Sequence, residues 1–263
     1  MNKSQNSRKT NLFIILGSIF LTNAILAEII GVKIFSAEKT LGFDPVNWTF
    51  FGEYLLDFNL TAGAVIWPVV FITTDIINEY FGKKGVKKIS FLTAGLIAYA
   101  FIVISVVTAL TPADFWLDVN ATTPDGESFN ISYAFNTIFR QGLGIIIGSL
   151  TAFLLGQLID VYVFQKLRSV TGENKIWLRA TGSTLVSQFI DSFVVLGIAF
   201  YVFGNWSLSQ IIAVGIMNYI YKMTVAIVLT PLLYVAHGII DKYLGKDLAE
   251  EMIEEASENK SFL

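Results

Sequence analysis

Acidic and amide side chains recur at helical spacing inside stretches that are otherwise apolar. One such stripe runs through the sequence WPVVFITTDIINEYFG, where spacings of three and four residues return to the same helix face. The stripe consists of Trp67, Phe71, Asp75, Asn78, Glu79 and Gly82. A carboxylate at the centre of a bilayer costs about 2.5 to 3.5 kcal/mol, so it normally faces a protein interior or a watery cavity. The stripe therefore predicts a polar site rather than a lipid-facing surface.

A second polar group is divided between two later apolar stretches. Gln188 and Asp191 lie three residues apart in one of them, and Asn218 and Lys222 lie four residues apart in the other. Each pair shares a helix face, so both could face the first stripe. Asp191 and Lys222 could also form a neutralised pair that only holds the bundle together.

Four weaker candidates lie in apolar surroundings. They are Asn23, Glu28, Gln157 and Asp160. Glu28 has the alternative of a structural hydrogen bond to a neighbouring helix, and Asp160 that of an ion pair with Arg179 or Lys166.

The composition indicates an integral membrane protein. The 263 residues are 54% hydrophobic and 15% charged, with a mean hydropathy of +0.62. The chain has no cysteine and one histidine, His237, which excludes disulfides, thiolate chemistry and Cys/His metal sites. No basic stripe for nucleic acid is present, and we expect no cofactor and no metal.

The apolar stretches predict an all-α integral membrane protein with six transmembrane helices in a single domain, 1–263. A bilayer core of about 30 Å needs about 20 helical residues. The six candidates cover residues 12–36, 61–82, 89–111, 143–166, 177–203 and 209–236. The Trp67–Pro68 pair is expected to loosen the second span, and the lysines after it to end that span.

The distribution of charge predicts an orientation. Fourteen of the 18 lysines and arginines lie in the two tails and in the connections after the second and fourth spans. Residues 37–60 and 112–141 are acidic instead. The positive-inside bias therefore predicts that both termini are cytoplasmic, with 237–263 as a cytoplasmic tail.

The connections predict little regular structure. Residues 41–60 are aromatic and acidic, which is typical of an interfacial loop or a short amphipathic helix. Residues 133–141 are expected to form a short external helix, and the acidic tail a short surface helix. His237 is expected at the membrane exit.

The first stripe also resembles a known family. Its pattern T-D-x-x-N-E-x-(Y/F)-G followed by lysines resembles the hallmark of the queuosine precursor transporters. Further similar segments carry Asp160 and Phe164 in the fourth span, Gln188, Asp191 and Ser192 in the fifth, and Asn218, Lys222 and Pro231 in the sixth. The resemblance covers all six spans in order, although region 112–141 is longer than is typical.

The resemblance implies a fold and a function. The family has a bundle similar to the vitamin-binding S components and takes up 7-cyano- or 7-aminomethyl-7-deazaguanine across the inner membrane for tRNA modification. No ATPase partner is implied. Apart from this small molecule and the lipid bilayer, we expect no nucleic-acid partner, and the small-residue helix faces would permit a homodimer.

A 7-deazaguanine fits the predicted polar residues. Its ring N–H and exocyclic amine could be met by Glu79 or Asp191. Gln188, Asn218 and Lys222 would then meet its acceptor atoms, and Trp67 or Phe71 would stack on the ring. An excess of buried acids would equally suit a protonation site.

Two other classes remain open from the sequence. An S component for another vitamin-like solute would use a similar pocket but need a separate energising module, and no clear Ala-x-x-x-Ala contact motif is present in the first span. An intramembrane enzyme is disfavoured because the chain lacks Gly-x-Gly-Asp, His-Glu-x-x-His and Gly-x-Ser-x-Gly motifs.

Overall fold

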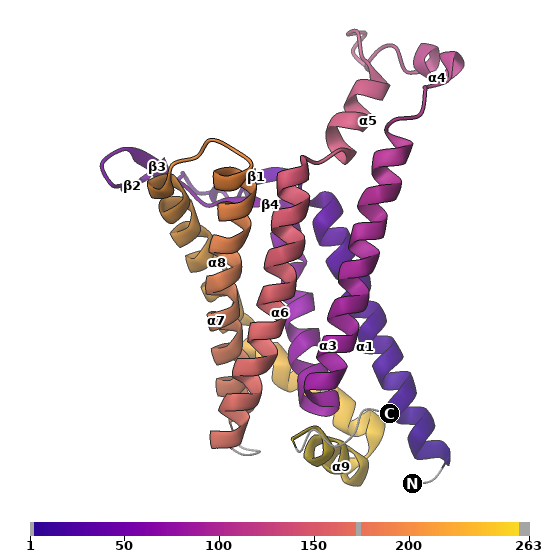
Figure 1. The fold of residues 1–263 in the computed structure, drawn as a ribbon, viewed down its shortest axis with the longest axis vertical. Coiled ribbons are helices and arrows are strands. Elements are labelled where there is room, and N and C mark those ends of the chain that lie inside the picture. Colours follow the sequence, from indigo (N-terminus) through magenta and orange to yellow (C-terminus); the bar gives the residue numbers. More distant parts are fainter. Residues whose placement is uncertain (1–2, 172–174, 258–263) are drawn as a thin grey trace.

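The structure, a computed structural model, describes residues 3–171 and 175–257 as a bundle of long helices (Figure 1). Within these residues, five helical stretches are long and apolar enough to cross a membrane. The helices that form them are α1 (Lys3–Ile30), α3 (Trp67–Val107), α6 (Leu143–Thr171), α7 (Ile176–Leu196) and α8 (Leu208–Leu244). The expected all-α membrane class is confirmed.

Short elements cover one end of the bundle (Figure 1). They are β1 (Ile34–Ser36), α2 (Ala37–Thr40), β2 (Trp48–Phe50), β3 (Tyr54–Leu56), β4 (Asn59–Thr61) and the 3-10 turn η1 (Ala62–Val65). Strand β1 pairs with β4 and β2 pairs with β3, both antiparallel. The expectation of a loop or amphipathic helix over 41–60 was therefore wrong in part. Phe51 and Gly52 both adopt positive φ, which makes the tight turn of a hairpin.

Glu38 of α2 stabilises this outer layer. Burial alone would raise the pKa of its carboxyl group, but the Phe58 N–H donates to its Oε1 at 2.7 Å and the Ser36 hydroxyl to its Oε2 at 3.1 Å. These hydrogen bonds favour the charged form, and the resulting pKa lies below the ordinary 4.5. The ionised carboxylate thus ties α2 to the residues just before β4.

We expect the outer layer to be acid-sensitive through this residue. A lowered pKa means that Glu38 contributes its full stability above pH 4.5, and that the contribution disappears as the pH falls through the folded-state pKa. Amide exchange of residues 34–61, corrected for its intrinsic pH dependence, should accelerate in acid. Glu38→Gln should remove this acid-dependent step and the exposed Glu53→Gln should retain it, whereas an unchanged profile in Glu38→Gln would contradict the assignment.

Helix α3 contains a sharp break at Gly82. Its 41 residues would span about 60 Å if straight, which is twice the thickness of a bilayer core. Gly82 has φ 62° and ψ −168°, a backbone conformation that is accessible almost only to glycine. Figure 1 shows α3 descending and then rising again toward α4. The reversal thus begins at Gly82, one residue before the lysines that the sequence indicated.

The expectation that Pro68 loosens this helix was also wrong. Pro68 lies in the first turn of α3, where its missing N–H has no partner to lose. It therefore helps to start the helix.

Replacing Gly82 should be costly. A Cβ there would lie 2.9 Å from the Ala256 carbonyl oxygen, and the backbone conformation would be strained in any other residue. We expect Gly82→Ala to lower the free energy of unfolding by about 1 to 3 kcal/mol. Gly95→Ala is the matched control, because Gly95 lies in the second half of α3 with no atom near its would-be Cβ. Chemical unfolding in detergent would measure both, and equal stability of the two variants would contradict the prediction.

Both ends of the described chain meet at the opposite end of the bundle from the strands (Figure 1). Lys9 of α1 lies 3.1 Å from Glu255 and 3.8 Å from Glu251 in the C-terminal helix α9 (Lys246–Ser257). Arg8 donates to the carbonyl oxygen of Leu244, the last residue of α8. The expected surface helix in the tail is thus present as α9, and its apolar face is buried against α3.

Helices α4 (Asp114–Val119) and α5 (Ile131–Phe139) project from the end that carries the strands (Figure 1). The expected helix near residues 133–141 is confirmed. The chain also makes a π-helical turn, η2 (Gly197–Val202), after α7.

Candidate functional site

The first half of α3 and helix α6 run side by side with polar residues facing each other. The Thr74 hydroxyl donates to Gln157 Oε1 at 3.4 Å, and Gln165 Nε2 donates to Asn78 Oδ1 at 2.7 Å. Residue numbers increase together in these contacts, so the two segments are parallel. This register places Asp75 opposite the turn of α6 that contains Asp160.

Asp191 and Lys222 form an ion pair between α7 and α8. Their side chains are 21% and 22% exposed, so the pair is accessible but largely removed from solvent. Gly156 of α6 lies directly opposite, because a Cβ at that position would be 3.8 Å from Asp191 Cβ. A small residue thus leaves space beside the carboxylate.

Aromatic rings lie on the adjoining helices α3 and α6. Trp67 and Phe71 of α3 stack at 6.0 Å between ring centroids with planes 19° apart. Trp67 also contacts Phe153 at 6.1 Å. Phe153 and Gly156 share a face of α6, which connects the aromatic group to Asp191.

A partly open hollow lies between α3, α7 and α8. Phe71 and Asp75 line it from α3, and Thr181 and Thr184 line it from α7. Thr181 and Thr230 of α8 are hydrogen-bonded at 2.8 Å. The hollow therefore brings one acid of the first stripe next to hydroxyl groups of α7 and α8.

Asp75 of α3 and Asp160 of α6 are both buried. They are 7% and 5% exposed. The Ser187 hydroxyl donates to Asp160 Oδ1 at 3.2 Å, and Ser183 and Thr184 lie beside the same carboxyl group. Asp75 Oδ1 and Asp160 Oδ2 have no hydrogen-bond partner among the described residues.

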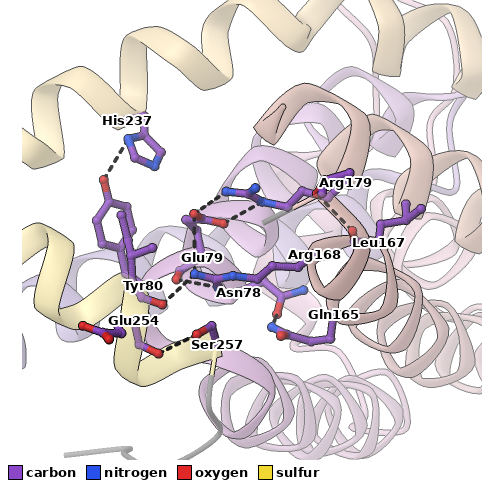
Figure 2. Close-up of polar contacts among 12 residues, drawn as sticks. Asn78, Glu79, Tyr80, Gln165, Leu167, Arg168, Arg179, His237, Glu254 and Ser257 are labelled. Atoms are coloured by element: carbon purple, nitrogen blue, oxygen red, sulfur yellow. Dashed lines mark hydrogen bonds and ion pairs between the residues drawn. The ribbon is translucent and has the colours of Figure 1, made fainter. Parts of the chain in front are cut away.

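Glu79 is fully occupied by arginines at the end of the bundle that carries α9 (Figure 2). Arg179 donates Nε to Oε2 at 3.0 Å and a terminal nitrogen to Oε1 at 2.5 Å. Arg168 lies 3.8 Å from Oε1, and it also donates to the Glu79 carbonyl oxygen at 3.2 Å and to that of Ile253 in α9 at 2.6 Å. Arg179 is thus paired with Glu79, and not with Asp160 as the sequence allowed.

Arg168 is a residue that the sequence reasoning missed. It is 4% exposed, although it lies in the cationic connection after the fourth span that the sequence predicted to be cytoplasmic. The sequence did indicate that Arg168 could face the interior, because it lies one turn after Phe164 and two turns after Asp160 on the same face of α6.

His237 lies in a second polar cluster near the same end of the bundle (Figure 2). The Tyr80 hydroxyl donates to Asp241 Oδ1 at 2.6 Å and lies 3.0 Å from His237 Nδ1. This cluster connects α3 to the last turns of α8.

The remaining candidate residues lie either one helical turn from the Asp191–Lys222 pair or on α1. Gln188 is buried one turn from Asp191, and Asn218 is half-buried one turn from Lys222. Glu28 lies beside Ser149 and within electrostatic range of Asp191. The Asn23 amide donates to the Ile19 carbonyl oxygen at 2.8 Å, which fixes it to its own helix. In 3–171 and 175–257, no group of three His, Cys, Asp or Glu side chains could hold a metal ion.

Residues 61–236 match a protein family described as "Putative vitamin uptake transporter". The match contains all of α3, α6 and α7 and most of α8, and with them the polar groups described above. The chain belongs to this transporter family.

Similar proteins from three bacteria have more specific names. The chain is 31% identical over 186 residues to a probable queuosine precursor transporter of Bacillus subtilis, covering 70% of this chain and 75% of the relative. It is 27% identical over 201 residues to the queuosine precursor transporter of Escherichia coli, covering 75% and 80%. A relative with the same function in its name, from Haemophilus influenzae, is 29% identical over 173 residues, covering 65% and 66%. No solved structure matches the chain.

Proposed function

We propose that this transporter takes up queuosine precursors, 7-cyano-7-deazaguanine or 7-aminomethyl-7-deazaguanine, across the inner membrane. The observation that carries the proposal is the Asp191–Lys222 pair, which lies opposite Gly156 of α6 in the region that the family shares. The names of the relatives supply the substrate class, and the bundle interior supplies matching chemistry.

The pair offers complementary groups to a 7-deazaguanine. A carboxylate can accept two hydrogen bonds, one from the ring N–H and one from the exocyclic amine, and an ammonium can donate to the ring carbonyl oxygen. Asp191 and Lys222 would therefore exchange part of their mutual contact for contacts with the base. Gln188 and Asn218, each one turn away, would complete the polar edge.

The aromatic group would hold the faces of the base. Trp67 and Phe71 already stack on each other, and a flat heterocycle that replaces one of these contacts would keep the stacking energy. Gly156 would leave room for the ring beside Asp191.

Asn78 and Glu79, two polar residues of the first stripe, have a supporting role in this proposal. Both Glu79 oxygens are held by arginine, and Asn78 accepts from Gln165. They would close the site at the end of the bundle that carries α9. Asp75 lies between this end and the aromatic group and borders the site.

The same proposal includes six crossings with cytoplasmic termini. The break at Gly82 would divide α3 into two crossings, and the ends of α1 and α9 lie together at the end that carries most lysines and arginines. The strands, α4 and α5 would then face the outside. The transporter would act without an ATPase partner.

Binding to the purified protein tests the substrate assignment. We expect full-length protein in lipid nanodiscs to bind 7-cyano-7-deazaguanine in isothermal calorimetry, and Asp191→Asn to weaken this binding. Adenine, which lacks the amine next to a ring N–H, should compete poorly. Equal affinity for adenine and the 7-deazaguanine would contradict the proposed donor-edge contacts.

A further inference from the structure

Asp75 and Asp160 are two buried carboxylates that face each other from α3 and α6. The neighbouring contacts of Thr74 with Gln157 and of Asn78 with Gln165 fix this register. The two carboxyl groups are close enough for their charges to interact. A charge on one of them therefore acts on the other.

Each member of the pair keeps one oxygen without a partner. Asp75 Oδ1 and Asp160 Oδ2 are both enclosed by protein, and no described residue donates a hydrogen bond to either. A buried acceptor that lacks a donor costs about 1 to 3 kcal/mol, and more when it is charged. A group that donates a hydrogen bond or carries positive charge would therefore be stabilised at this site.

The cations around the pair are bound elsewhere. Charged side chains on the packed helices include Glu28 of α1, Glu79 of α3, Arg168 of α6, Arg179 and Asp191 of α7 and Lys222 of α8. Both arginines hold Glu79, and Lys222 holds Asp191. No ion pair reaches Asp75 or Asp160 within the described residues.

We propose that the Asp75–Asp160 pair binds one proton and couples proton entry to substrate uptake. Two adjacent negative charges without a cation are unfavourable in a dry interior, whereas one shared proton supplies a donor to an orphan oxygen and halves the charge. This inference rests on the proposed function for the substrate, but not for the proton site itself.

The position of the pair explains how the two events would be linked. Asp75 lies one helical turn from Phe71, so a base stacked on Trp67 and Phe71 lies next to it. Asp75 also lines the hollow, which gives the proton a route that does not pass through the Glu79 cluster. A proton received at the outer side would be released when the bundle opens toward the cytoplasm.

Infrared spectroscopy tests the proton site without any substrate. In nanodiscs at neutral pH, the wild-type protein should show a protonated carboxyl band that shifts in D₂O. Asp75→Asn and Asp160→Asn should each lose this band, and Asp118→Asn, at an exposed acid of α4, should keep it. A band that is unchanged in both interior variants would overturn the proposal.

Transport in vesicles tests the coupling. With 7-cyano-7-deazaguanine outside and a pH-sensitive dye inside, uptake should acidify the lumen. A gradient of one pH unit should support up to about tenfold accumulation at one proton per molecule. In Asp160→Asn, any remaining uptake should neither acidify the lumen nor exceed equilibrium.

The outcomes separate the two proposals. Uptake that needs a sodium gradient, or that proceeds without acidification in the wild type, overturns proton coupling and leaves the substrate assignment standing. The opposite result is also informative. If the wild type shows no uptake but has a carboxyl band that depends on both aspartates, the substrate assignment is contradicted and the proton site is supported.

Discussion

Glu79→Gln should destabilise the protein by about 3 to 5 kcal/mol, the largest effect that we expect from a single conservative substitution. Glutamine keeps the shape of the side chain but removes the charge. Arg179, which is 1% exposed, would then be buried without its counter-ion, and Arg168 would lose part of its environment. Because Arg168 also binds Ile253, the contact between α6 and α9 should weaken as well.

Unfolding of the purified protein in detergent would measure this effect, with Lys246→Ala as its control. Lys246 forms an ion pair with Glu250 on the exposed surface of α9 at 3.9 Å, and pairs of this kind contribute at most about 1 kcal/mol. The double variant Glu79→Gln with Arg179→Gln should recover part of the lost stability, since it leaves no unpaired charge between these two positions. Wild-type stability of Glu79→Gln would show that the cluster does not hold this end of the bundle together.

Asp191→Asn should reduce uptake about 100-fold, the second large effect. Loss of one partner from a largely buried charge pair typically costs 2 to 5 kcal/mol, and about 2.7 kcal/mol corresponds to a factor of 100. Asparagine has one acceptor oxygen where the donor edge of the base needs two, and it leaves Lys222 without a counter-ion. Uptake should be compared at equal abundance in the membrane.

The control for this prediction is Glu53→Gln, at an exposed position in the outer layer. It carries the same change of charge and should leave uptake unchanged. The alternative, in which Asp191 and Lys222 only hold α7 against α8, predicts a different result. Asp191→Asn would then lower stability while uptake per folded molecule stayed at the wild-type level.

The helices and the interior stripes could be predicted because both depend on local periodicity. Apolar runs of about 20 residues identify the spanning segments, and spacings of three and four identify residues that share a face. Asp75, Asn78 and Glu79 are indeed all buried on the first half of α3. These features require no knowledge of which helices are neighbours.

Partners between helices could not be predicted, because they depend on the packing of segments far apart in the chain. Arg179 lies 100 residues from Glu79, and sequence alone gave Asp160 as a nearer alternative. Arg168 lies among other cationic residues of the connection after the fourth span, and its contact with α9 depends on how the tail folds back. The end of the second span at residue 82 was predicted, but the positive φ of Gly82 was not, because a glycine in an apolar run is also compatible with a continuous helix.

The outer strands show a further limit. Residues 41–60 have an aromatic composition that suits a membrane interface in any backbone conformation, whether loop, helix or strand. The hairpins depend on positive φ at Phe51 and on pairing of β1 with β4 across more than 20 residues. Neither is visible in composition.

Uptake of radiolabelled 7-cyano-7-deazaguanine, by cells that can neither make nor import it, tests the central claim most directly. The cells would express this chain alone, and Asp191→Asn would be measured at the same membrane abundance. We predict uptake by the wild-type chain that is almost abolished in the variant. No uptake by a well-expressed wild-type chain, or equal uptake by both, would contradict transport of this base through the Asp191–Lys222 site.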